Sequence, residues 1–270
     1  MPRKHTMAIA YDFDGTLAPG NMQEHLLLPE LGIPKDEFWN DLDRETEKYQ
    51  ADRVLAYMQL VLKKAQEKGI SICRRELEAC GKGLCLFPGV EPWFDRITAY
   101  GRERDILIEH YLISAGNAEI IEGTSIASKF AKIYASKFIF DENGVACWPA
   151  LAINYTGKTQ YLFRINKGVH DISDNEGVNR HIDEIERPIP FERIIFIGDG
   201  MTDIPCFRLV SNKGGLSIAV YNPAEPNAKN EAEAQKKFGR AHQAVPADYT
   251  KNGALEKLVT ARIAYINSLL

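Results

Sequence analysis

The chain has 270 residues, of which 45% are hydrophobic and 26% are charged, and its formal net charge is −4. A mildly acidic chain has no overall electrostatic reason to bind nucleic acid or an anionic membrane surface, and we expect neither partner. No apolar run approaches the roughly 18 residues that would be needed to span a bilayer. The length predicts one sizeable core, or a core domain with a smaller satellite.

The cysteines and the N-terminus indicate a cytoplasmic location. Five cysteines are an odd number, and they show no paired CxxC spacing of the kind that binds a metal. Reduced thiols are typical of cytoplasmic proteins. The apolar stretch 7–11 is too short for the hydrophobic part of a signal peptide. The cysteines are Cys73, Cys80, Cys85, Cys147 and Cys206.

Short apolar runs along the chain predict buried strands. Residues 7–11, 111–113 and 194–197 are apolar, and each run is followed by a polar or glycine-containing turn. A fourth strand is expected at 216–220. Helical patterns lie between the runs, so the sequence predicts an α/β fold with a mostly parallel sheet.

The stretch from about 20 to 86 has a different character, because no strand-like run interrupts it. Between Gln50 and Lys68 the apolar positions follow the spacing of one helical face, and Gly69 stands where a helix-ending glycine belongs. We expect an all-helical insertion after the first strand, with a return hinge at 87–90. The apolar positions are Val54, Leu55, Met58, Val61, Leu62 and Ala65.

Two later segments carry weaker signals. Residues 137–140 and 145–148 flank a turn that contains Asn143 and Gly144, which predicts a β-hairpin with an Asn-Gly turn. Residues 222–243 have only modest helical character, and we expect a solvated surface segment there.

Two pairs of aspartates follow the first and third predicted strands. Asp12 and Asp14 form one pair, and Asp199 and Asp203 form the other. In a parallel sheet, groups just beyond the carboxyl ends of the strands gather at one edge. Four carboxylates brought together repel one another unless a cation lies between them, and Mg²⁺ is the usual ion where phosphate is handled. A single aspartate could simply cap a turn, but two pairs interleaved with glycine favour a metal site.

These motifs carry a family resemblance. The segment 12–17 (Asp-Phe-Asp-Gly-Thr-Leu) resembles the first motif of the haloacid dehalogenase-like hydrolase superfamily, and 198–203 resembles its fourth. Ser114 and Lys158 resemble the second and third motifs, and all four stand in the family order. Within the superfamily, the likeness is closest to phosphoserine-phosphatase-type members.

The resemblance implies a domain organisation. It predicts a Rossmann-like three-layer α/β core formed by residues 1–18 and 88–270, with residues 19–87 inserted as an all-helical cap of the C1 type. It also implies Mg²⁺ as the cofactor.

The resemblance further implies a role for each motif residue. Asp12 would attack phosphorus, Asp14 would act as general acid and base, and Lys158 would neutralise the developing charge. Substrate-binding positions would be Thr16, Ser114, Ala115 and Gly116. Metal-site positions would be Asp12, Asp14, Asp199 and Asp203, with Asp14 contributing its backbone carbonyl.

Three assignments stay open at this stage. Lys167 rivals Lys158, because Lys158 lies a long way before Asp199 for a member of this kind. Glu24 lies a few residues from the position where phosphoserine phosphatases keep an acid for the substrate amine. His25 could reach a substrate from the cap, but a surface position is expected.

The sequence thus predicts a Mg²⁺-dependent phosphatase that hydrolyses a small phosphomonoester through an aspartyl-phosphate on Asp12. The expected partner is a small phosphorylated metabolite, and the expected state is a monomer or a homodimer. Alternatives are a hydrolase with another leaving group, dehalogenase-like or acting on a phosphonate, a signalling receiver domain, and a non-catalytic phosphate-binding or regulatory protein. The physiological substrate stays open.

Overall fold

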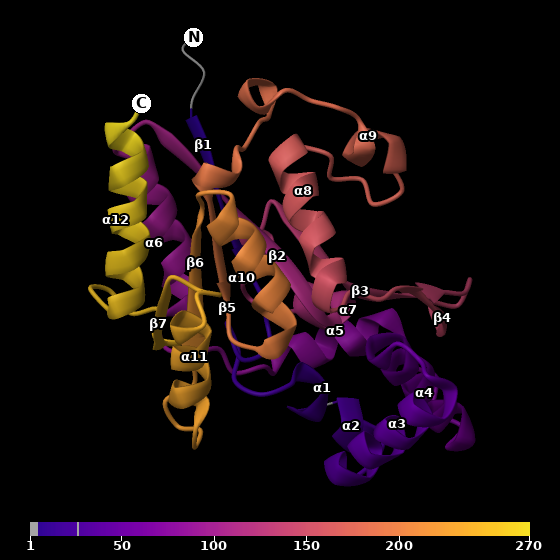
Figure 1. Cartoon of the computed structure of the whole chain (residues 1–270). Helices are drawn as coiled ribbons and strands as arrows, with labels where there is room; N and C mark the ends of the chain where they lie inside the picture. Colours follow the sequence, from indigo (N-terminus) through magenta and orange to yellow (C-terminus); the bar gives the residue numbers. More distant parts are fainter. Residues whose placement is uncertain (1–4, 26) are drawn as a thin grey trace.

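The computed structural model describes residues 5–25 and 27–270. Its centre is a seven-stranded sheet with the order β4-β3-β2-β1-β5-β6-β7. All neighbouring strands are parallel except β3 and β4. The predicted α/β fold with a mostly parallel sheet is therefore confirmed (Figure 1). The strands are β1 (His5–Tyr11), β2 (Ile106–Asn117), β3 (Lys132–Phe140), β4 (Ala146–Leu151), β5 (Ile194–Gly198), β6 (Leu216–Tyr221) and β7 (Gln243–Pro246).

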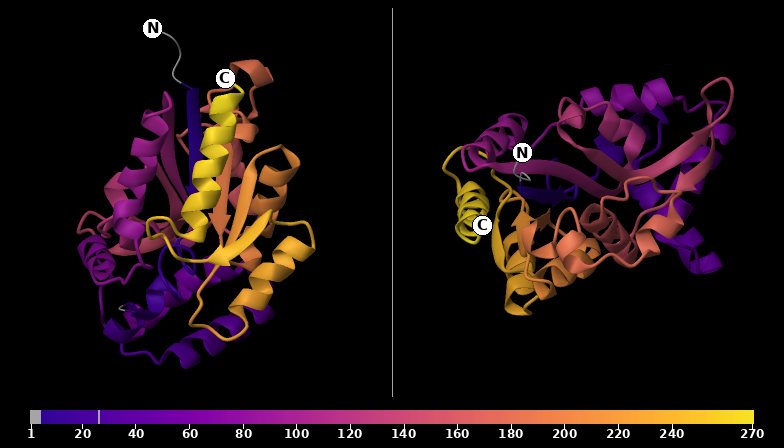
Figure 2. Two further views of the ribbon diagram at one scale, coloured as in Figure 1. Left: turned by 90° about the vertical axis from the view of Figure 1, so that its left-hand side faces the viewer. Right: turned by 90° about the horizontal axis from the view of Figure 1, so that it is seen from above.

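Helices cover both faces of the sheet, which is why the central strands are apolar throughout. Along β1, Met7, Ile9 and Tyr11 pack on one face and Ala8 and Ala10 on the other, and all five are fully buried. The first face is covered by α6 (Val90–Arg102), α7 (Ala118–Glu122) and α12 (Ala254–Ser268). The second is covered by α8 (Thr159–Lys167), α10 (Ile204–Asn212) and α11 (Ala228–Lys237). Figure 2 shows the resulting three layers from two further sides.

The chain between β1 and α6 is helical, as predicted. Its helices lie beyond the carboxyl ends of the strands, at the bottom of Figure 1. Apart from one isolated bridge between Cys73 and Val145, no β-pairing involves the described residues of this segment after the short turn at Asp14–Ala18. The helices are α1 (Met22–His25), α2 (Leu27–Glu30), α3 (Lys35–Tyr49), α4 (Arg53–Glu67) and α5 (Arg74–Lys82).

Helix α4 forms where the periodicity predicts a helix. Asp52 caps it by accepting a hydrogen bond from the Leu55 N–H, and Gly69 follows its end at a φ of +67°. The predicted buried face is wrong at Leu55, which is exposed. The buried stripe is Tyr57, Met58, Leu60, Val61 and Ala65. Tyr57 can be buried because its hydroxyl donates a hydrogen bond to Asn117 in the core.

The two connections between core and helical segment lie side by side. The Phe87 N–H donates to the Leu17 carbonyl at 2.9 Å. Tyr249, from the C-terminal part of the chain, donates its hydroxyl to the Thr16 carbonyl and its N–H to the Pro88 carbonyl, both at 2.9 Å. The division of the chain into domains at residues 18 and 88 stays a prediction. The helical segment also contacts the core elsewhere, because α5 packs directly against α7.

That packing depends on two glycines. A Cβ on Gly81 of α5 would lie 1.9 Å from the Ile120 carbonyl oxygen, and one on Gly123 would lie 1.8 Å from the Glu78 carbonyl oxygen. Such distances are shorter than any van der Waals contact, so only glycine lets the two helices approach this closely. Helix α5 is therefore held against the core more tightly than a surface helix would be.

Two local predictions were wrong. Strand β2 does not end at Ile113 but continues through Asn117, with a register shift against β3 between Ser114 and Asn117. The hairpin of β3 and β4 exists, but its turn is a five-residue loop, in which the Asp141 side chain accepts the N–H groups of Asn143 and Val145. Only Gly144 has a positive φ there, so the loop is not the two-residue turn expected for Asn-Gly.

The segment 222–243 is also more ordered than expected. Helix α11 occupies its centre and buries Ala232 and Gln235 against the sheet, and β7 follows. The remaining helices are short. They are α9 (Asn175–Asn179) and the 3-10 helices η1 (Ala127–Lys129), η2 (Tyr155–Lys158), η3 (Glu184–Glu186), η4 (Phe191–Arg193) and η5 (Met201–Asp203). Among the described residues, no helix has the length and apolarity needed to cross a membrane.

Candidate active site

The topology of the sheet brings the first, second and fourth motifs to one edge. Strand β1 pairs with β2 on one side and with β5 on the other, and Tyr11 lies opposite both Leu112 and Ile197. Asp12 follows the last residue of β1, and Asp199 follows the last residue of β5. Ser114 lies near the carboxyl end of β2, so all three residues lie at the same edge of the sheet. The chain crosses from one side of β1 to the other between β4 and β5, and such switch points are where open α/β sheets bind ligands.

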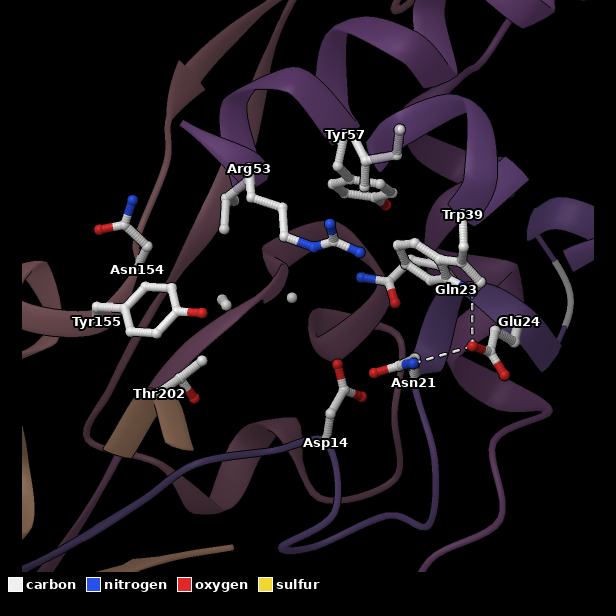
Figure 3. A pocket seen from close by; sticks show the side chains of 14 residues that line it. Asp14, Asn21, Gln23, Glu24, Trp39, Arg53, Tyr57, Asn154, Tyr155 and Thr202 are labelled. Carbon is white, nitrogen blue, oxygen red and sulfur yellow. Dashed lines mark hydrogen bonds between the residues drawn. The ribbon is translucent and has the colours of Figure 1, made fainter. Parts of the chain in front are cut away.

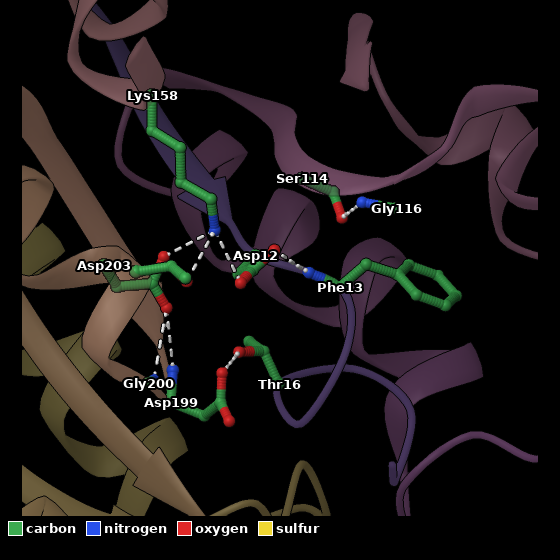
Figure 4. A network of polar contacts seen from close by, with 10 residues as sticks. Asp12, Phe13, Thr16, Ser114, Gly116, Lys158, Asp199, Gly200 and Asp203 are labelled. Carbon is green, nitrogen blue, oxygen red and sulfur yellow. Dashed lines mark hydrogen bonds and ion pairs between the residues drawn. The ribbon is translucent and has the colours of Figure 1, made fainter. Parts of the chain in front are cut away.

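Lys158 ties the first and fourth motifs together (Figure 4). Its Nζ donates to Asp12 Oδ2 at 2.6 Å and to Asp203 Oδ1 at 2.7 Å, and lies 3.5 Å from Thr202 Oγ1. The Lys158 side chain is fully buried. Burial opposes its positive charge, but the two carboxylates outweigh that effect and raise the pKa of Lys158 above its usual range. The two carboxylates therefore favour the charged ammonium form of Lys158 at the end of β1.

The rival lysine lies elsewhere. Lys167 is at the last turn of α8, and its Nζ donates to the carbonyl oxygens of Val178 and Arg180, both at 2.7 Å. Those bonds hold the loop after α8, so Lys167 supports local structure. Of the two lysines, the structure brings Lys158 to Asp12.

Three carboxylates gather beside Lys158. Asp12, Asp199 and Asp203 each offer an oxygen within 4.8 Å of the others. Three negative charges face the single positive charge of Lys158, and an oxygen-only donor set suits a hard divalent cation such as Mg²⁺. Burial and the charges of Asp203 and Asp12 raise the pKa of Asp199 well above its usual value. A cation among the three would relieve that repulsion, so the residues present fit a metal ion.

Local geometry explains the glycines of the two acidic motifs. Gly15 has a φ of +69°, and a Cβ there would lie 2.0 Å from Asp199 Oδ2. A Cβ on Gly198 would lie 2.3 Å from Asp203 Oδ2, which accepts the N–H of Asp199 at 3.1 Å. Thr16, predicted to bind substrate, is buried and lies 3.5 Å from Asp199 Oδ1, so its hydroxyl contacts the acidic cluster.

Asp14 lies apart from the acidic cluster and faces the helical segment. Its Oδ1 accepts the Met22 N–H at 2.9 Å, and its side chain lines a cavity between core and cap. Burial, and then the charge of Asp12, raise the pKa of Asp14 to about 8. Asp12 and Asp14 thus have different environments although they are two residues apart.

The second motif lies in the last residues of β2, where the register against β3 shifts. Ser114 is buried, and its Oγ accepts the Gly116 N–H at 3.0 Å. Ala115 and Gly116 line the same cavity as Asp14. These predicted phosphate-binding positions therefore lie next to the acidic groups, on the side that faces the cap.

The cavity between core and cap has a volume of about 420 Å³ (Figure 3). Its floor belongs to the core and its opposite wall to α3 and α4. Most of the lining residues have no sequence pattern that would have identified them. Two lie near predicted motifs, since Thr202 is within the fourth motif and Tyr155 is three residues before Lys158. The residues that the sequence did not predict are Asn21, Gln23, Trp39, Leu42, Arg53, Val54, Tyr57, Asn154, Tyr155 and Thr202.

Glu24 lines the cavity, whereas His25 does not. The Glu24 Oε1 accepts the Trp39 indole N–H at 2.8 Å and the Asn21 amide at 2.9 Å. His25 is exposed, and its Nε2 contacts the Pro19 carbonyl at 3.1 Å. The surface position expected for His25 is the one that it occupies.

One hydrogen bond joins the cap wall directly to the core. Tyr57 of α4 donates its hydroxyl to Asn117 Oδ1 at the end of β2, and both side chains are buried. Asn117 follows Ser114, Ala115 and Gly116 in the chain. A cavity-lining residue of the cap is therefore bonded to the segment predicted to hold phosphate.

The sequence model of the haloacid dehalogenase-like hydrolases matches residues 9–208. The chain belongs to this family. The match includes all four motifs and the helical segment, so the predicted family is confirmed and the protein is a hydrolase of this superfamily.

One relative and several solved structures are similar to this chain over most of its length. An uncharacterized protein of Borreliella burgdorferi strain B31 is 28% identical over 290 residues, which covers 97% of this chain and 98% of the relative. A solved HAD family hydrolase, t0658 from Salmonella enterica serovar Typhi, superposes with a TM-score of 0.61 at 18% identity, over 94% of this chain and 69% of that one.

Phosphoserine phosphatases are also among the similar structures. One, solved as a phospho-aspartyl intermediate analogue, has a TM-score of 0.54 at 17% identity and covers 96% of this chain and 99% of its own. Another, solved with bound substrate, has a TM-score of 0.55 at 18% identity over 95% of this chain and 98% of that one. Likeness at this level of identity establishes the shared fold.

Proposed function

We propose that this hydrolase is a Mg²⁺-dependent phosphatase of a small phosphomonoester. The observation that carries the proposal is the position of Lys158, which bonds to Asp12 at 2.6 Å beside three clustered carboxylates and a cavity. A fixed ammonium beside a carboxylate nucleophile suits transfer of a doubly negative phosphoryl group, because it stabilises charge on both reacting partners. The similar solved phosphoserine phosphatases support the same chemistry.

In the first half-reaction, a carboxylate oxygen of Asp12 forms a bond to phosphorus while the bond from phosphorus to the leaving oxygen breaks. Asp14 gives its proton to that leaving oxygen. Asp14 can reach the leaving group because it lines the cavity, whereas Asp12 is nearly covered. The products are a phosphoryl group on Asp12 and an alcohol in the cavity.

In the second half-reaction, Asp14 takes a proton from water, which attacks the same phosphorus and releases phosphate from Asp12. Ser114 and the segment that follows it hold the phosphoryl oxygens from the cap side. Lys158 neutralises negative charge throughout. The cap separates the two steps by excluding bulk water during transfer.

Asp12, Asp199 and Asp203 are the residues that would hold Mg²⁺. When bound, the ion would offset negative charge on the carboxylates and on the phosphoryl oxygens. The proposal includes a cytoplasmic location, supported by five cysteines that all remain free thiols.

Hydrolysis of p-nitrophenyl phosphate, measured with Mg²⁺ and with excess chelator, tests the proposal. We expect metal-dependent turnover that Asp12→Asn abolishes, and a phosphate adduct on Asp12 detectable by intact-protein mass spectrometry. Asp95→Asn is the matched control, because Asp95 is an exposed aspartate that pairs with Lys129. Full activity in chelator would contradict metal dependence, and turnover of chloroacetate but no phosphate ester would favour a dehalogenase.

A further inference from the structure

Tyr155 has a backbone conformation that tyrosine rarely adopts. Its φ is +26°, in a region that side chains with a Cβ disfavour. It opens the 3-10 helix η2, which ends at Lys158. Non-glycine residues in such conformations persist where the surroundings hold them, and they cluster at functional sites.

Half of the Tyr155 side chain is open to solvent. The residue is 50% exposed, and no hydrogen bond involves its hydroxyl among the described residues. It lines the cavity, and Figure 3 shows its ring lying across the cavity from the cap, with the hydroxyl pointing inward. A strained residue with an exposed aromatic ring that faces a cavity is available to a bound molecule.

The opposite wall of the cavity is aromatic as well. Trp39 of α3 and Tyr57 of α4 stack with ring centroids 6.3 Å apart and an interplanar angle of 28°. The cavity therefore presents aromatic surfaces from the cap on one side and from the core on the other. Flat rings pack favourably against such surfaces, in offset or edge-on arrangements.

The two cap charges that line the cavity are already paired within the protein. Glu24 lies 4.0 Å from Lys35 Nζ and also accepts hydrogen bonds from Trp39 and Asn21, and the Arg53 guanidinium pairs with Asp43. A leaving group therefore need not carry charges that complement them. Among the lining residues, Gln23 and Asn154 offer uncharged amide groups.

We propose that Tyr155 is a specificity-determining residue supplied by the core, and that the leaving group it contacts contains a flat unsaturated ring with hydrogen-bonding substituents. The inference rests on the proposed function for the phosphoryl half of the site. In this proposal, Tyr155 from the core and the aromatic wall of Trp39 and Tyr57 from the helical segment both contact the leaving group.

Binding of two phosphonates tests Tyr155 without requiring turnover. Phenylphosphonate and methylphosphonate share the phosphoryl-like group and differ in the ring, so the ratio of their Kd values measures recognition of the ring. We expect Tyr155→Gly to reduce the preference for phenylphosphonate about 3- to 10-fold, the range of a lost aromatic contact. Methylphosphonate affinity should stay unchanged, and Tyr155→Phe should keep most of the preference.

Thermal stability separates recognition from a structural role. Glycine adopts a positive φ freely, so Tyr155→Gly should melt at the same temperature as the wild type or higher while its selectivity falls. Gln50→Gly is the matched control, because Gln50 has a φ of +50° after α3 and lies outside the cavity. It should change stability alone. If Tyr155→Gly does not fold, Tyr155→Asn replaces it, since asparagine also tolerates this conformation.

The outcomes distinguish the two proposals. Unchanged phosphonate selectivity in Tyr155→Gly, with phosphatase activity present, overturns the role of Tyr155 alone. Absent hydrolysis with selectivity that depends on Tyr155 contradicts the phosphatase proposal alone. A higher kcat/KM for phosphoserine than for phenyl phosphate overturns the ring-bearing leaving group, and failure to bind either phosphonate overturns the inference as a whole.

Discussion

The floor and the wall of the cavity are built in different ways. The floor rests on a buried ion network of Asp12, Lys158 and Asp203, which do not line the cavity themselves. They are joined by bonds of 2.6 and 2.7 Å, and each follows a strand or ends a short 3-10 helix. On the wall, Trp39 and Arg53 project from helices of the inserted segment. The floor depends on the hydrogen-bonded sheet, whereas the wall depends on how helices pack.

This difference teaches where change is tolerated. Changing a residue of this network leaves a charge unpaired at the buried carboxyl edge of the sheet, where unpaired charge is costly. Changing a wall residue alters the shape of a cavity while the strands below keep their positions. We therefore expect changes at the ion network and at Asp14 to affect turnover, and changes in the helical wall to affect mainly selectivity.

The largest effect is expected for a change at Asp14, which should slow the two half-reactions to different extents. Asp14→Asn should lower steady-state turnover roughly 10²- to 10⁴-fold, as loss of a general acid–base group does. A nitrophenolate leaving group needs no proton, so the first half-reaction should still give a burst, and phosphate should accumulate on Asp12.

Rapid-mixing kinetics and intact-protein mass spectrometry detect the burst and the adduct. Absence of both, with phosphate binding intact, would mean that Asp14 acts before transfer. Asp14 would then organise the loop through its bond to the Met22 N–H and would not act as acid and base.

The next effect contrasts two lysines. Lys158→Met should lower kcat roughly 10²- to 10³-fold, because it removes a preorganised charge at the reacting centre. It should also destabilise the fold by about 3–5 kcal/mol, since Asp12 and Asp203 lose their shared partner. Lys167→Met is the control and should keep kcat near the wild-type value.

Activity is measured at a temperature where circular dichroism finds both variants folded. Similar losses of kcat in the two lysine variants would remove the distinction between Lys158 and Lys167.

A third prediction concerns the support beneath the floor. His110 is buried, with Nδ1 3.0 Å from the Tyr11 hydroxyl and Nε2 3.1 Å from Thr98 Oγ1. Burial lowers the pKa of His110 to about 4 from its usual 6.5. The unfolded chain therefore binds this proton more readily, and His110 costs stability progressively as the pH falls from about 6.5 to 4.

The loss is on the order of 3 kcal/mol across that window. Denaturant unfolding of the wild type and of His110→Gln, at several pH values, measures it by difference. The variant should lose less stability on acidification, and parallel curves would show that His110 does not carry the effect.

The smallest expected effect tests the bond between wall and floor. Tyr57→Phe removes the hydroxyl that donates to Asn117 and should cost about 0.5–1.5 kcal/mol of stability, the range for one hydrogen bond. We expect KM for an aryl phosphate to rise a few-fold with kcat nearly unchanged. Tyr49→Phe, on the exposed end of α3, is the control.

A double variant completes that test. If the two side chains act as a pair, Tyr57→Phe combined with Asn117→Ala should cost less than the two single changes added together. Additive effects would mean that wall and floor are energetically independent.

The sequence by itself determined the acidic half of the candidate site. The runs before Asp12 and Asp199 are apolar on both faces, so they must be buried strands, and parallel strands bring their carboxyl ends to one edge. The glycines between the aspartates add a constraint, because Gly15 leaves no room for a Cβ beside Asp199. The family, the acidic pairs and the all-helical insertion could therefore be predicted.

Only the tertiary structure decided which residues line the cavity and which lysine contacts Asp12. Lys158 ends η2 and Lys167 ends α8, and only the packing of these elements on the sheet decides which ammonium reaches Asp12. Trp39, Tyr57 and Tyr155 meet across one cavity although more than a hundred residues separate the first from the last. Helical periodicity predicts that a face is buried but not what it is buried against, and that is why the wall of the cavity could not be predicted from the sequence.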